Sequence, residues 1–170
     1  MNPVLGVDPS FNRTGWAVLR TSGEGSLLEA TGIIAPRPGE RGERLLTIWK
    51  EFGLILDRCQ PVAVYLERPG TWQRAGGTRR ETIEMLSMSR ALMIVACADR
   101  CVPVHEVEVH VVRRAVFGRV NASGGDVLDF VRSQGYEIPR RPRGGPDADI
   151  ANAIVMALYG ISLSNGEFQH

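Results

Sequence analysis

Three acidic positions in the sequence have surroundings that suit chemistry. Residues 4–8 form a short apolar run that ends at Asp8, and residues 62–67 form another that ends at Glu67. Asp147 and Asp149 open the last apolar stretch of the chain. Functional side chains collect where the strands of an α/β sheet end, so we expect these carboxylates to converge. Carboxylates suit Mg²⁺ or Mn²⁺, and two such ions can activate water and stabilise the leaving oxygen of a phosphodiester.

Each of these acids also has a structural interpretation. Asp8 precedes Pro9 and could start a turn, and Glu67 could be a solvated strand end. Asp147 and Asp149 could be the cap and a first-turn residue of a helix, where negative charge is favoured. Taken one at a time, structural roles for such residues are more common than catalytic ones. The surrounding motifs must therefore decide between the two.

The hydrophobic pattern predicts an α/β domain that would position these residues. Strands are expected at residues 4–8, 16–19, 27–35, 62–67 and 102–107, the first three as an antiparallel meander. Helices are expected at residues 43–59, 82–98, 109–117, 126–134 and 147–161. This order favours a mixed five-stranded sheet flanked by helices. The 170 residues suit a single domain with its core at about 3–162 and a short tail at 163–170.

The composition says more about the cellular compartment of the protein than about its activity. The formal net charge of +1 excludes no partner, because a protein can bind nucleic acid through one basic face. The three cysteines include no CxxC motif, and an odd number without a secretion signal indicates a reducing compartment. The N-terminal apolar run is too short for a signal peptide, because the acidic residue Asp8 ends it. No apolar stretch approaches the ~20 residues that are needed to span a bilayer. These features predict a soluble cytoplasmic protein.

Three motifs together resemble the RuvC-type Holliday junction resolvases of the RNase H-like nuclease superfamily. They are LGVDPS with TGWAV (5–10 and 14–18), VAVYLE (62–67) and DIANAIVMAL (149–158), and the match runs from about residue 4 to 160. The resemblance implies an RNase H-like fold and a homodimer that cuts four-way DNA junctions. It also implies that Asp8, Glu67 and Asp149 are catalytic and hold Mg²⁺, for which Mn²⁺ could substitute.

The last motif departs from the family pattern at Asn152. The family places a second acidic ligand three residues after the first, on the same helix face, and here asparagine stands at that place. A carboxamide offers a carbonyl oxygen but no charge, so Asn152 predicts weaker metal binding. Asp147 could compensate as a further ligand. The alternatives are a junction-binding protein that no longer cuts, or a related nuclease acting on RNA; an actin-like kinase would need a second lobe.

Basic clusters flank the acidic motifs and could contact DNA. The first surrounds Trp72 in a glycine-rich loop at 68–80, which suits phosphate contact and base stacking. The clusters comprise Arg68, Arg74, Arg79 and Arg80; Arg113, Arg114 and Arg119; and Arg140, Arg141 and Arg143. Trp72 could instead pack its loop onto the body, and each arginine cluster could be a solvated face.

The predicted helix at residues 82–98 is apolar over more than one face, because Met85, Met88 and Met93 lie among further apolar residues. This excess predicts a subunit interface, or else a helix buried on both sides within one chain. The sequence gives no sign of whether branch-migration machinery is a further partner.

Overall fold

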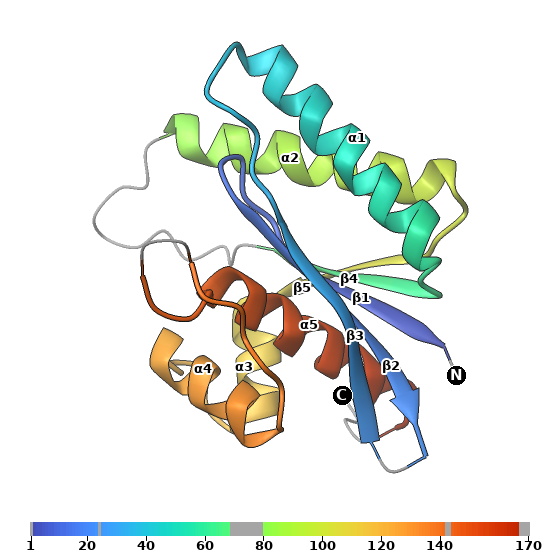
Figure 1. Ribbon diagram of the computed structural model, residues 1–170, viewed down its shortest axis with the longest axis vertical. Coiled ribbons are helices and arrows are strands. Elements are labelled where there is room, and N and C mark those ends of the chain that lie inside the picture. The colour runs from blue at the N-terminus through green and yellow to red at the C-terminus, as the bar shows by residue number, and fades with distance from the viewer. Residues whose placement is uncertain (1, 24, 69–79, 142–143, 167–170) are drawn as a thin grey trace.

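A single five-stranded mixed sheet organises the computed structural model, which describes residues 2–23, 25–68, 80–141 and 144–166 (Figure 1). Its strands are β1 (Pro3–Asp8), β2 (Thr14–Ser22), β3 (Gly25–Ile34), β4 (Ala63–Arg68) and β5 (Val104–Glu108), in the order β3-β2-β1-β4-β5. Strands β1, β2 and β3 pair antiparallel, while β4 runs parallel to both β1 and β5. The predicted fold class is confirmed.

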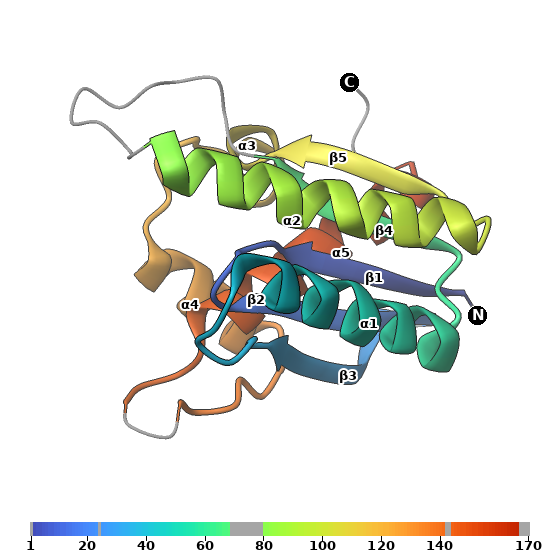
Figure 2. The same ribbon diagram turned by 90° about the horizontal axis from the view of Figure 1, so that it is seen from above.

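Helices cover both faces of this sheet. On one face lie α1 (Arg41–Cys59) and α2 (Arg80–Asp99), side by side in Figure 2. On the other face lie α3 (Val109–Phe117), α4 (Gly124–Ser133) and α5 (Ala148–Ser164). Each face encloses its own apolar cluster, and α5 is apolar nearly all round because the sheet covers one side and α3 and α4 cover others.

The observed element boundaries differ from the predicted ones where backbone hydrogen bonds continue beyond the apolar residues. Strand β2 was predicted at residues 16–19, but its ladder with β3 continues through polar residues to Ser22. The last helix was predicted from Asp147 but begins at Ala148, because Asp147 is its N-cap. No helix in the described part of the chain is long and apolar enough to cross a membrane.

Helix α5 approaches the sheet very closely, at two glycines. A Cβ added at Gly6 on β1 would lie 2.1 Å from the carbonyl oxygen of Ala153. One added at Gly15 on β2 would lie 2.2 Å from the carbonyl oxygen of Asp149. Real side chains do not tolerate such distances to backbone, so only glycine lets the first turns of α5 rest on β1 and β2. This contact sets where the acidic end of α5 stands relative to Asp8.

Candidate active site

Asp8 and Glu67 stand at the ends of two neighbouring parallel strands. Val7 on β1 pairs with Leu66 on β4, so the next residue of each strand is one of the two acids. Burial raises the pKa of Asp8 to about 6, with a further increase from the charge of Asp149. Burial and the charge of Asp8 raise the pKa of Glu67 to about 8. The fold thus holds two carboxyl groups together where neither is well solvated.

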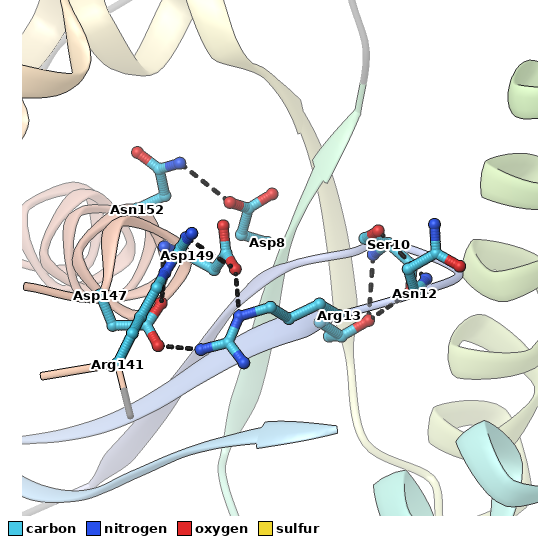
Figure 3. Close-up of polar contacts among 9 residues, drawn as sticks. Asp8, Ser10, Asn12, Arg13, Arg141, Asp147, Asp149 and Asn152 are labelled. Carbon is cyan, nitrogen blue, oxygen red and sulfur yellow. Dashed lines mark hydrogen bonds and ion pairs between the residues drawn. The ribbon is translucent and has the colours of Figure 1, made fainter. Parts of the chain in front are cut away.

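Asn152 and Arg113 relieve part of this repulsion. The Nδ2 of Asn152 donates a hydrogen bond to Oδ2 of Asp8 at 2.9 Å, and this contact lowers the pKa of Asp8 (Figure 3). The positive charge of Arg113, on α3, lowers the pKa of both acids. Glu67, Arg113 and Asn152 also line one small cleft. The structure therefore brings Asn152 to the two acids, as the three-residue spacing from Asp149 suggested.

Asp149 is held by two arginines. Its Oδ2 accepts from Nε of Arg13 at 2.8 Å and from Nη2 of Arg141 at 3.3 Å (Figure 3). Its other oxygen lies on the side of Asp8 in the same view. Asp149 is thus placed next to the Asp8–Glu67 pair but is already in contact with positive charge.

Asp147 has a structural place in this arrangement. Its Oδ1 accepts from the backbone N–H of Asp149 at 3.2 Å, which makes it the N-cap of α5. Its carboxylate, 4% exposed, pairs with Arg13 and lies 3.6 Å from Nε of Arg141. Both oxygens of Asp147 are thus engaged at the start of α5, in contacts that suit a structural role.

The donors suit a hard divalent cation in their chemistry. Asp8 and Glu67 supply oxygens whose mutual repulsion a cation would remove, and Asn152 adds a carbonyl oxygen. Within the described residues, no three Asp, Glu, His or Cys side chains already form a group that could hold a metal. The pair Asp8–Glu67 lies at the centre of the candidate site, and Asp149 and Asn152 are its neighbours on α5.

The predicted DNA-binding arginines have different surroundings. Arg113 faces the acids, and Arg114 is exposed on α3. Three others are paired with carboxylates: Arg68 with Glu108, Arg80 with Glu84 at 3.1 Å, and Arg119 with Asp126 at 2.6 Å. Arg140, next to Arg141, forms an isolated antiparallel β-bridge with Pro146. Trp72, Arg74, Arg79 and Arg143 lie outside the described residues.

Arg13 is the site residue that sequence reasoning missed. It stands in the turn between β1 and β2, inside the first motif, and reaches acids more than 130 positions away. The only sequence signal was an arginine five residues after Asp8, directly before the second strand.

Comparisons with known proteins identify the family of this chain. Residues 4–159 match the family model of crossover junction endodeoxyribonuclease RuvC. The chain belongs to the RuvC family. The RuvC of Prochlorococcus marinus is 31% identical over 159 residues, which cover 92% of this chain and 96% of that protein. The RuvC of Vibrio atlanticus is 28% identical over 158 residues, covering 93% and 86%.

Solved RuvC structures share the fold. T. thermophilus RuvC in complex with a Holliday junction substrate superposes with a TM-score of 0.82 at 22% identity, covering 98% of this chain and 97% of that one. A second Thermus thermophilus RuvC structure gives 0.77 at 24% identity, covering 96% of each chain. The likeness shows that the described part of this chain has the fold of these proteins.

The raised pKa values predict how stability depends on pH without metal. Between the usual pKa of 4.5 and the raised value of about 8, Glu67 holds its proton in the folded state and loses it when unfolded. Stability is therefore lost as pH rises through this window. Glu67→Gln cannot ionise, so in EDTA it should match the original protein near pH 5 and exceed it by on the order of a few kcal/mol near pH 9.

Urea unfolding across this pH range measures the difference. Glu51→Gln, on an exposed part of α1, controls for losing a carboxyl elsewhere. Equal pH dependence of the original protein and Glu67→Gln would show that Glu67 is not held protonated.

Proposed function

We propose that this protein is an endonuclease that cuts four-way DNA junctions with divalent metal held at Asp8, Glu67 and Asp149. Two facts support the proposal. The chain matches the RuvC family along 4–159, and its half-buried Asp8–Glu67 pair stands at the carboxyl ends of β1 and β4 beside Asp149. The second fact carries the chemistry, because two poorly solvated carboxyl groups with raised pKa values, one of them raised by its neighbour's charge, form a site for positive charge.

Different residues of the site would bind the ion, contact the phosphate and position the acids. A bound divalent cation would supply activated water and charge neutralisation at the phosphodiester. Asp8 and Glu67 offer the oxygens for it, from the rigid ends of β1 and β4. Arg113 adds a guanidinium beside them that suits a phosphate oxygen. Asn152 holds Asp8 in place by donating to it.

We propose Mg²⁺ as the ion, with Mn²⁺ able to replace it, because the donors are oxygens. The DNA would lie over the arginines near this edge, with Trp72 stacking on a base. Arg114 and Arg140 are among the exposed arginines of the described residues. Cys59, Cys97 and Cys101 are free thiols, which supports the reducing cytoplasm as the place of action.

Cutting and binding should separate in Asp8→Asn. The variant should lose cleavage of a four-way junction at least about 100-fold, since the charge that holds the ion is gone, yet keep junction affinity. Binding persists because phosphate contacts by arginines supply most of the affinity. Gel assays of four-way DNA, linear duplex and RNA substrates, each with and without Mg²⁺, measure both properties. An Asp8→Asn variant that still cuts fully would remove Asp8 from the mechanism.

A second candidate, a junction-binding protein that no longer cuts, has one observation in its favour. Asn152 stands where the family pattern has an acid and contacts Asp8 as a neutral donor. If the original protein binds junctions tightly but leaves them uncut at any Mg²⁺ or Mn²⁺ concentration, this candidate replaces the first.

Asn152→Asp should add a negative charge to the site and lower the stability of the metal-free protein. An acid at position 152, in addition to Asp8, Glu67 and Asp149, removes a hydrogen-bond donor and adds like-charge repulsion, so stability without metal should fall. Metal then stabilises the variant more than the original, because the added negative charge strengthens cation binding. Cleavage should rise most at low Mg²⁺. Melting curves and cleavage rates across a Mg²⁺ titration test this, and no gain at any concentration would remove position 152 from the metal site.

We also propose a homodimer formed through α2. Met85 and Met93 are buried in the chain, but Ile83, Met88 and Val95 are 51%, 38% and 57% exposed. Exposed apolar groups along one helix favour a protein interface, and a two-fold dimer would match the symmetry of a four-way junction.

A charge on this surface should break the dimer. Val95→Glu should give a monomer by light scattering at micromolar concentration, because a buried unpaired charge is costly. Leu27→Glu, equally apolar and 64% exposed but on β3, is the matched control and should leave assembly unchanged. A monomeric original protein, with and without DNA, would contradict the dimer.

A further inference from the structure

We propose that Arg13 is a positioning residue for the metal site, which fixes the carboxylate of Asp149 so that one oxygen faces Asp8. The proposal rests on the proposed function in one respect, that Asp149 is a metal ligand. It assigns a role to a turn residue that contacts neither Asp8 nor Glu67 in any described hydrogen bond or ion pair.

The turn that carries Arg13 is itself well fixed. Ser10 and Thr14 close it, since the Thr14 hydroxyl donates to the Ser10 carbonyl at 2.8 Å and accepts from the Ser10 N–H at 3.0 Å. On the α1 side, Nη2 of Arg44 donates to Oδ1 of Asn12 at 2.7 Å. The turn therefore presents Arg13 from a defined backbone position toward the start of α5 (Figure 3).

The guanidinium of Arg13 joins two carboxylates with two different nitrogens. Nε donates to Oδ2 of Asp149 at 2.8 Å, and Nη2 donates to Oδ2 of Asp147. Asp147 is nearly buried and caps α5, so its place is fixed by the helix. Arg13 thus links the carboxylate of Asp149 to that of Asp147, which the helix holds in place, through one planar guanidinium.

Arg141 repeats the contact from another direction. Its Nη2 donates to the same Oδ2 of Asp149 at 3.3 Å, and its Nε lies 3.6 Å from Oδ1 of Asp147. Both arginines thus occupy one oxygen of Asp149, and the other oxygen lies on the side of Asp8 (Figure 3). This arrangement leaves Asp149 prepared to offer one oxygen to an ion beside Asp8.

The sign of the effect distinguishes positioning from simple charge. Arg13 is positive, so removing it would strengthen cation binding if only its charge mattered. If Arg13 orients Asp149, removing it weakens cation binding instead, because groups that hydrogen-bond to a metal ligand typically contribute 10–100-fold to affinity. Asn152 brings no charge of its own, which makes the orientation of Asp149 more important here.

The test is Mn²⁺ binding to the DNA-free protein, followed by electron paramagnetic resonance. Arg13→Gln should raise the Kd for Mn²⁺ by about 10–100-fold. Arg13→Lys should not restore it, because one ammonium cannot span both carboxylates with a fixed fork. Arg44→Gln, which loosens the same turn from its other side without touching a carboxylate, should keep the original Kd even if it lowers the melting temperature.

Further variants keep the test decisive. Should Arg13→Gln fail to fold because Asp147 is left buried and charged, the double variant Arg13→Gln/Asp147→Asn removes that charge and should show the same weakened binding. Unchanged or tighter Mn²⁺ binding in the variant that folds overturns the positioning role alone. An original protein that binds no Mn²⁺ overturns the metal site and this role together, whereas one that binds Mn²⁺ without cutting DNA leaves the role of Arg13 fully testable.

Discussion

Helix α5 rests on β1 and β2 through direct backbone contact at Gly6 and Gly15, and the candidate site depends on that contact. Strand β1 carries Asp8, and the first turns of α5 carry Asp149 and Asn152. A Cβ atom at either glycine would lie only 2.1–2.2 Å from a backbone carbonyl oxygen of α5, well inside van der Waals contact, and would push the helix away. The hydrogen bond from Asn152 to Asp8 spans 2.9 Å, so even a small displacement of α5 would break it.

Electrostatic balance is the second consequence of this packing. Asp8 and Glu67 lie in a poorly solvated place; burial raises the pKa of both, and neighbouring carboxylates raise them further, Asp149 for Asp8 and Asp8 for Glu67. The positive charge of Arg113 offsets part of this negative charge on one side of the site. At the start of α5, Arg13 forms ion pairs with Asp147 and Asp149. Functional sites commonly store such unfavourable charge, since the same arrangement gives a cation or a phosphate a place to bind.

Much of the architecture could be predicted because it follows from local patterns. Apolar runs that end in an acid gave β1 with Asp8 and β4 with Glu67, and both acids lie at the same sheet edge. The helix at 109–117 was predicted with its observed bounds. Less was predictable where polar residues continue an element, as in β2, because backbone pairing with β3 rather than side-chain hydrophobicity extends that strand. The Asp147 position had two interpretations, and the N-cap geometry favours the structural one.

The sequence by itself determined the order of the elements, the acids at the strand ends and the family to which the chain belongs. These are properties of residue type and spacing, and periods of two or 3.6 residues can be read along a chain. Only the tertiary structure decided that Asn152 donates to Asp8 and that Arg13 binds Asp147 and Asp149. Charge–charge and hydrogen-bond energies depend on distance through space, and these partners lie more than 130 residues apart in the chain.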